Sequence, residues 1–131
     1  MEMEITFPGG ARVDASFGPH IVRTDQPPAG GGEGSAPTPF ALFLSSFGTC
    51  AGSYVLGFLR KRDLPTDNVK LIQRTHRDPE SGMTDRVEIE IMLPADFPEK
   101  YRDAIVRAAG QCAVTQHLEK PPAILVRALQ G

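Results

Sequence analysis

The stretch S-S-F-G-T-C-A-G-S-Y-V-L-G-F, Ser45 to Phe58, decides how this chain folds. It lies inside a longer run, Gly34 to Leu59, that carries no charged residue. Pro39 marks the start of a helix within that run, because proline is favoured in the first helical turn. The basic run Arg60 to Arg62 complements the negative end of a helix dipole, so we expect the helix to end at Arg62.

Large apolar residues occur on every side of this helix in a helical-wheel projection. Such a helix either spans a membrane or is buried on all sides. Small residues dilute its hydropathy and the rest of the chain has the pattern of a compact soluble domain, so we expect no membrane partner. A sheet would cover one side of the helix and a second copy of the chain the other, which predicts a homodimer. Gly48 and Gly52 lower helix propensity by about 1 kcal/mol each, which indicates that another backbone comes close to the turn that carries Cys50.

The length and composition describe an ordinary globular protein. The chain has 131 residues, which predicts one domain over residues 1–131. Hydrophobic residues make up 40% and charged residues 23%, and the net charge of −2 comes without a basic stripe, so we expect no nucleic-acid partner. The acidic start M-E-M-E has no basic leader segment, and two cysteines do not form a disulfide framework. These features predict a cytoplasmic protein.

The segments around the helix alternate between strand and helix patterns. Turn residues separate short alternating runs, which predicts an antiparallel meander followed by a Gly- and Pro-rich loop from Thr24 to Pro39 and, after the helix, a hairpin. Apolar residues spaced three and four apart predict a helix at Pro98–Gln111. We expect a short helix at Ala113–Glu119, which Pro121 and Pro122 would end, and a last strand at Ile124–Ala128. This order predicts an α+β fold. The other predicted strands are Glu4–Phe7, Arg12–Phe17, His20–Thr24, Val69–His76 and Thr84–Leu93.

Each cysteine has two interpretations. Cys50 is either a small buried packing residue or a nucleophile, and a nucleophilic thiol needs a nearby cation or helix N-terminus. Cys50 lies about three turns into the helix, too far from its N-terminus for strong help, so a cation from the early strands, Arg12 or Arg23, would have to supply it. Cys112 is either a core residue or a resolving thiol that condenses with a sulfenic acid. Their spacing does not establish that they meet.

Other chemistries lack the required patterns. Two cysteines and three scattered histidines match no metal-ligand spacing, so we expect no metal. The run G-G-G-E-G has neither the lysine nor the following serine or threonine of a phosphate-binding loop.

Two motifs carry a resemblance to a known family. P-T-P-F-A-L-F-L-S-S-F-G-T-C-A, Pro37 to Ala51, resembles the first cysteine signature of the osmotically inducible protein C and organic hydroperoxide resistance (OsmC/Ohr) superfamily, in its OsmC-like branch. A-A-G-Q-C-A-V-T, Ala108 to Thr115, resembles the second. The resemblance implies an intertwined homodimer with long central helices flanked by antiparallel sheets. It also implies a thiol peroxidase for small organic hydroperoxides in which Cys50 attacks, Cys112 resolves, no cofactor is needed and an external dithiol restores the enzyme.

One residue departs from the family pattern. Catalytic members carry a glutamate ten residues before the first cysteine, where it orients an arginine, and this chain has Phe40 there. Arg23, just before the loop, is the candidate for that arginine, and Glu33 is a candidate for the missing carboxylate. The loss of charge at Phe40 favours an alternative function, a non-catalytic protein that binds a small apolar or thiol-bearing ligand at the dimer interface. A redox sensor that uses the same cysteine pair is a further alternative.

Overall fold

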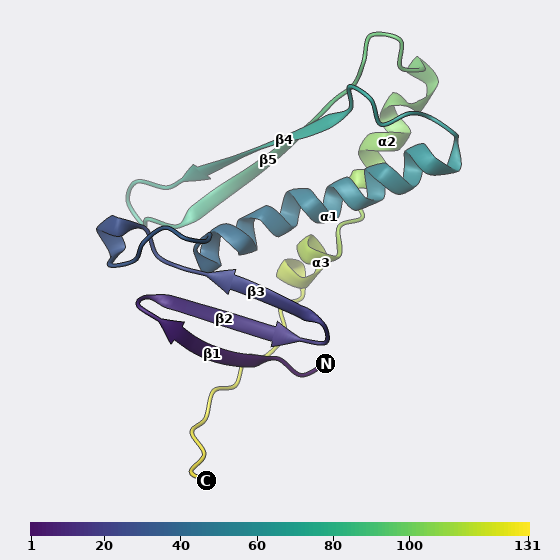
Figure 1. The fold of residues 1–131 in the computed structure, drawn as a ribbon. Coiled ribbons are helices and arrows are strands. Elements are labelled where there is room, and N and C mark those ends of the chain that lie inside the picture. The colour runs from purple at the N-terminus through teal and green to yellow at the C-terminus, as the bar shows by residue number, and fades with distance from the viewer. The chain divides into compact units, whose positions relative to one another are not determined.

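The computed structural model describes residues 1–131, which form two compact units, residues 1–45 and 46–131. The helix α1 begins in the first unit and continues through the second. Sheets and helices occur in the predicted order, which confirms the α+β fold (Figure 1). The elements are β1 (Glu4–Gly9), β2 (Arg12–Phe17), β3 (His20–Thr24), α1 (Pro39–Lys61), β4 (Lys70–Arg77), β5 (Thr84–Met92), α2 (Arg102–Ala109) and α3 (Ala113–Glu119).

The first unit is built on an antiparallel meander in the order β1-β2-β3. Ala15 of β2 lies opposite Ile5 of β1 on one side and Val22 of β3 on the other. The turns between the strands contain glycines with positive φ, Gly10 at 56° and Gly18 at 54°, a conformation that glycine adopts without strain. The three strands predicted from alternation are confirmed.

The Gly-rich loop after β3 is organised around one buried carboxylate. Asp25 is 1% exposed and accepts hydrogen bonds from the Ser35 hydroxyl at 2.6 Å and from the N–H groups of Gln26, Ser35 and Glu33 at 2.7, 3.0 and 3.4 Å. Gly32 passes so close that a Cβ there would lie 2.6 Å from the Asp25 carboxylate. The loop therefore has a defined conformation, in which its backbone surrounds the Asp25 carboxylate.

The second unit buries one face of α1. Val55, Phe58 and Leu59 form its core with Ile105 of α2, which is completely buried. Half-buried residues of the hairpin β4-β5, Leu71 and Ile91 among them, pack against this cluster. The hairpin is in continuous antiparallel register from Lys70 and Met92 to His76 and Arg86, and it confirms the prediction of two strands with one wet face.

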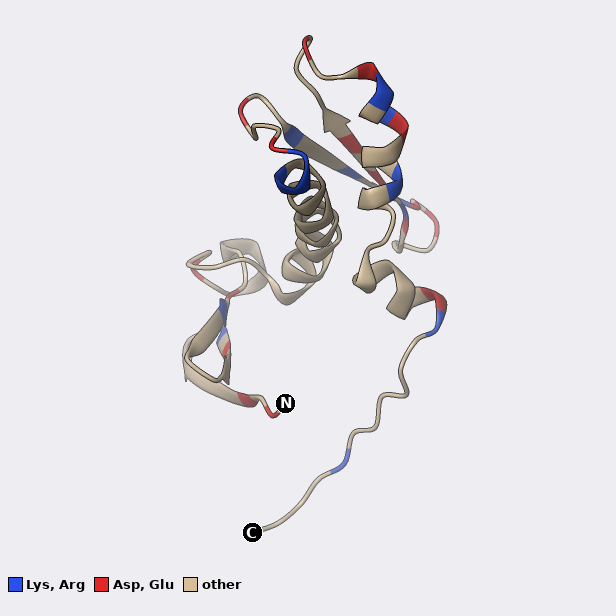
Figure 2. Cartoon of the chain, turned by 90° about the vertical axis from the view of Figure 1, so that its right-hand side faces the viewer, with Lys and Arg blue, Asp and Glu red and all other residues tan.

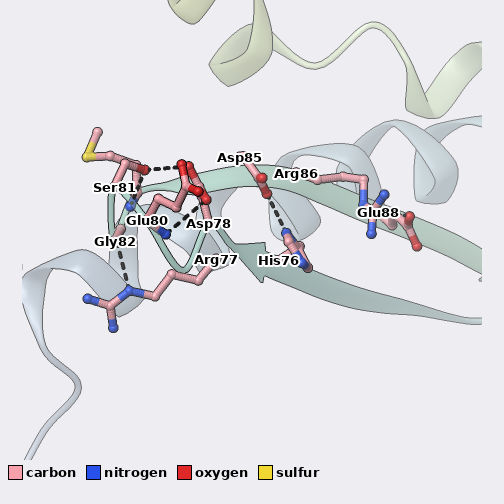
Figure 3. A network of polar contacts seen from close by, with 10 residues as sticks. His76, Arg77, Asp78, Glu80, Ser81, Gly82, Asp85, Arg86 and Glu88 are labelled. Atoms are coloured by element: carbon pink, nitrogen blue, oxygen red, sulfur yellow. Dashed lines mark hydrogen bonds and ion pairs between the residues drawn. The ribbon is translucent and has the colours of Figure 1, made fainter.

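Polar contacts hold the turn of that hairpin (Figure 3). Asp78 accepts a hydrogen bond from the Ser81 hydroxyl at 2.9 Å and from the Glu80 N–H at 3.1 Å. Arg77 donates to the Gly82 carbonyl at 2.8 Å, and Gly82 has a φ of 73° that favours glycine. These contacts close the turn locally and help to set the register of the two strands.

The opposite face of α1 is open. Figure 2 shows the helix without charge along most of its length, with basic residues at its end. Thr49, Ser53, Leu56 and Gly57 of this face are exposed. The helix is long and apolar enough to cross a membrane, but a core helix of a soluble protein passes the same test, and the buried side of α1 carries such a core.

The two glycines of α1 have different surroundings. A Cβ at Gly48 would lie 2.5 Å from the side-chain oxygen of Gln73 on β4. A side chain, not a backbone, therefore approaches here, which corrects the expectation from sequence. At Gly52 a Cβ would meet nothing within 4 Å.

Two predicted elements differ from the structure. The helix expected at Pro98–Gln111 begins with a 3-10 turn at Glu99–Tyr101 and becomes α2 only at Arg102. The strand expected at Ile124–Ala128 is wrong for this protomer, because the chain after Lys120 forms no secondary structure. Its apolar side chains are almost fully exposed, at 84% for Ile124, 90% for Leu125 and 93% for Val126.

The hydrogen bonds that the loop donates to the Asp25 carboxylate predict a specific loss of stability in acid. The Ser35 hydroxyl and N–H, followed by the N–H groups of Gln26 and Glu33, lower the pKa of Asp25 to about 2 against the opposing effect of burial. Because the folded state favours the ionised carboxylate, this stabilisation is full above the ordinary pKa of about 4 and is lost as pH falls through about 2.

Urea unfolding between about pH 5 and pH 2 measures this effect. We expect Asp25→Asn to be less stable than wild type at pH 5 and the difference to shrink as the pH falls toward 2. Asp96→Asn, at an exposed aspartate, is the control and should follow wild type throughout. A difference between Asp25→Asn and wild type that stays constant with pH would contradict the role of the ionised carboxylate.

Candidate active site

The structure brings the two cysteines together in the second unit. Cys50 lies midway along α1 and is half-buried, and Cys112 directly precedes α3 and is 4% exposed. Both are free thiols, and Cys50 lies close to Cys112. The question that sequence spacing left open is therefore answered, since two thiols 62 positions apart along the chain share one site.

The surroundings of Cys112 favour its thiolate. Burial raises the pKa of the Cys112 thiol, but the N–H and hydroxyl of Thr115, the Cys50 thiol and the N–H of Val114 outweigh burial, so this pKa is lowered from its ordinary value. The two N–H groups belong to the first turn of α3. They make no complete capping hydrogen bond to the sulfur, yet their dipoles point toward it and stabilise negative charge there.

An apolar groove of about 350 Å³ leads to this thiol. One wall is the inner side of β5, with Val87, Ile89 and Ile91, and Phe47 and Ala51 of α1 lie across from it. The helix α2 completes the lining with Val106, Ala109 and a single charged side chain, Arg102, and Cys112 and Thr115 lie where α2 gives way to α3. A small apolar molecule in this groove would reach Cys112.

The arginines considered from sequence belong to the first unit. Arg23 of β3 lies opposite Asp14 of β2 in the sheet register, and both line a hollow of about 370 Å³ together with Arg12. Arg12 donates a hydrogen bond to the Gly9 carbonyl at 3.2 Å, so the turn between β1 and β2 engages it. Arg12 therefore has a structural role in this turn, and Arg23 does not. That Arg23 activates Cys50 stays a prediction.

Phe40 and Glu33 do not recreate the orienting pair of the family pattern. Phe40 is 54% exposed in the first turn of α1, with its ring 5.7 Å from that of Phe43. The Glu33 N–H donates a hydrogen bond to the Asp25 carboxylate. Glu33 lines a small hollow of about 100 Å³ together with Arg12, and Arg23 does not line that hollow.

Sequence reasoning missed three residues of interest: Thr115, Asp25 and Arg102. A signal existed for Thr115, because a hydroxyl three residues after a cysteine at a helix start can reach back to it. Asp25, followed within ten positions by Ser35, is a weaker signal of the same kind. Arg102 had none, since its place in the groove depends on how α2 packs.

The family model described as OsmC-like protein matches residues 32–127, which include both cysteines and most of the chain. The protein therefore belongs to the OsmC-like protein family, whose members are typically oligomeric. A search of curated proteins finds no match.

Solved structures agree with this assignment at the level of the fold. A protein of Psychrobacter arcticus described as an osmotic stress induced and detoxification response protein is 19% identical, with a TM-score of 0.72 over 87% of this chain and 85% of that one. A hypothetical protein from Aquifex aeolicus is 19% identical, with a TM-score of 0.67 over 92% and 87% of the two chains. The organic hydroperoxide resistance protein OsmC of Legionella pneumophila is 18% identical, with a TM-score of 0.51 over 90% and 89%.

The contacts of Cys112 predict how its thiol titrates. Cys50→Ser keeps a possible donor beside Cys112, whereas Cys50→Ala removes it. We expect the pKa of the remaining thiol to be higher in Cys50→Ala than in Cys50→Ser, and higher again when Thr115→Val is added. The ultraviolet absorbance of the thiolate as a function of pH measures this order. Equal pKa values in all three variants would show that these neighbours do not stabilise the thiolate.

Proposed function

We propose that this protein is a thiol-dependent peroxidase that reduces organic hydroperoxides through Cys50 and Cys112. The observation that carries the proposal is the proximity of the two thiols, one of which, Cys112, lines an apolar groove. A sulfenic acid formed on one thiol lies within reach of the other, as disulfide formation requires. No metal or organic cofactor enters this chemistry.

The lowered pKa of Cys112 gives that residue a role before resolution. As the Cys50 sulfur attacks the peroxide, the Cys112 thiolate acts as general base and accepts the Cys50 proton. The Cys50 sulfur forms a bond to the distal peroxide oxygen as the O–O bond breaks. The departing alkoxide takes the proton from Cys112 and leaves as the alcohol, with Cys50 now a sulfenic acid.

Disulfide formation and its reduction by an external dithiol return the site to its starting state. The Cys112 thiolate attacks the Cys50 sulfur, the S–S bond forms and the S–O bond breaks, with hydroxide leaving to be protonated by solvent. An external dithiol of the cytoplasm then reduces the disulfide by thiol–disulfide exchange. Arg23 is the proposed cation that holds the peroxide and favours the Cys50 thiolate.

We further propose that the working form is an intertwined homodimer. The open face of α1 carries the small residues Thr49, Ser53 and Gly57, which allow close approach of another helix, and the exposed Leu56 beside them. The apolar side chains after Lys120 are likewise exposed, and such clusters mark interaction sites in stable proteins. A second copy of the chain would cover both. Residues 1–131 form one domain of such a dimer in this proposal.

The alternative function, non-catalytic binding of a small apolar or thiol-bearing ligand, is favoured by one observation. Phe40 places an exposed aromatic ring where a catalytic member needs a carboxylate. A binder or a redox sensor would not turn over with a dithiol, and this separates both from a peroxidase.

Hydroperoxide consumption with a dithiol tests the proposed function. We expect turnover in wild type to fall by at least about a hundredfold in Cys50→Ser, since this removes the nucleophile. Cys112→Ser should react once, at a reduced rate, and leave Cys50 as a sulfenic acid that a trapping reagent detects. Free-thiol counts should fall by two per chain in oxidised wild type. No turnover, with both thiols intact after peroxide, would reject the peroxidase in favour of the binding protein.

Sedimentation velocity tests the homodimer. Ser53→Phe places a large ring on the open face of α1 and should shift the protein from dimer to monomer. Ala95→Phe, at an exposed position between β5 and α2, is the matched control and should remain a dimer. A wild type that sediments as a monomer, or a Ser53→Phe variant that remains a dimer, would contradict the proposed packing.

A further inference from the structure

The face of the hairpin that packs on α1 carries a half-buried glutamine. Gln73 of β4 is paired in the strand register with Ile89 of β5, which lines the groove. Leu71 lies two residues earlier on the same face of β4 and packs against the core of the unit. An amide in an apolar interface costs free energy unless it is hydrogen-bonded, so apolar packing alone does not account for Gln73.

The side chain of Gln73 lies directly on the backbone of α1 at Gly48. A Cβ at Gly48 would lie 2.5 Å from the Oε1 atom of Gln73, 3.7 Å from its Cδ and 3.9 Å from its Cβ. No side chain of the helix separates the two elements at this turn. Because glycine lets a neighbour come closer than any other residue does, this pair sets how near β4 lies to α1.

Gly48 is next to the residues that form the cysteine site. It precedes Cys50 by two residues, and the nearby Phe47 and Ala51 are buried and line the groove. A disulfide requires the two Cβ atoms to lie about 3.5–4.5 Å apart, so a displacement of α1 by about an ångström decides how readily Cys50 bonds to Cys112. The spacing between β4 and α1 therefore affects the chemistry of the two thiols.

We propose that Gly48 and Gln73 are positioning residues, whose contact holds the turn of α1 that carries Cys50 at the distance from Cys112 at which a disulfide forms. A methyl group on residue 48 would push against Gln73 and move this turn relative to β4. The disulfide would then be less favourable. This inference rests on the proposed function only in taking the Cys50–Cys112 disulfide from it, and it concerns the geometry of the pair rather than turnover.

Equilibration of the full chain in glutathione buffers measures this geometry without peroxide. The two protein thiols and one oxidised glutathione give the protein disulfide and two reduced glutathiones, and alkylation after an acid quench separates the two protein forms. Gly48→Ala should lower the equilibrium constant for the disulfide by about five- to tenfold, because the thiols must move to meet. A Gly48→Ala variant with the constant of wild type would overturn the inference.

Gly52 provides the matched control. It lies two residues after Cys50 where Gly48 lies two residues before it, and a Cβ at Gly52 would meet nothing within 4 Å. Both glycine-to-alanine changes raise helix propensity alike, but only one meets Gln73. Gly52→Ala should keep the equilibrium constant of wild type. If it lowers the constant as much as Gly48→Ala does, the helix backbone and not the contact governs the pair, and the inference fails.

A double substitution tests the contact itself. In a Gln73→Ala background the added methyl group of Gly48→Ala meets no glutamine, so Gly48→Ala should leave the equilibrium constant unchanged there. An equal loss with and without the Gln73 side chain would contradict the proposal. Urea unfolding of the reduced variants separates positioning from folding. A Gly48→Ala variant that is less stable but has an unchanged disulfide equilibrium would assign the contact to folding alone and reject the inference.

This inference and the proposed function can fail separately. Disulfide equilibria that depend on Gly48 and Gln73 in a protein without hydroperoxide turnover would uphold the inference and reject the peroxidase. Turnover with the same equilibrium constant in every variant would reject the inference and leave the peroxidase in place. A wild type that forms no intramolecular disulfide in glutathione would also reject the inference, whatever its turnover.

Discussion

The second unit depends on the burial of one face of an uncharged helix. Val55, Phe58 and Leu59 of α1 pack on Ile105, and this contact fixes where α2 runs and therefore where Cys112 falls. Removing apolar area from water is the dominant favourable term in folding, and α1 offers that area without interruption by charge. Because Cys50 lies on the same helix, the packing that holds the core together also brings the two thiols into contact.

The sequence predicted most of the fold because local patterns specify most of it. Alternation located the meander and the hairpin, and α3 was predicted at its observed bounds, Ala113 to Glu119. The strand predicted at Ile124–Ala128 failed for a physical reason. Strand propensity describes a fit to a neighbouring strand, and this protomer provides no neighbour. The sequence analysis expected a backbone beside Gly48, and the structure places the side chain of Gln73 there. A glycine in a helix indicates that space is tight but does not identify the atom that fills it.

The site was predictable in part. Motifs singled out Cys50 and Cys112, but their contact arises from packing between segments distant along the chain, which no spacing rule reaches. The same limit applies to Arg102, whose place in the groove depends on how α2 packs. Asp25 was missed because a loop rich in glycine and proline looks flexible in composition, although one buried carboxylate can order it.

Phe40 replaces the family's glutamate, so this site needs another way to stabilise a thiolate. In the family pattern an oriented arginine stabilises the first thiolate. Here the neighbours of Cys112 stabilise a thiolate locally, through the first turn of α3, Thr115 and the Cys50 thiol. In the proposed mechanism this thiolate activates Cys50 by taking its proton, a step that needs no carboxylate at position 40. Loss of that carboxylate and retention of both cysteines are therefore compatible, provided that the two thiols stay close together when substrate enters the groove.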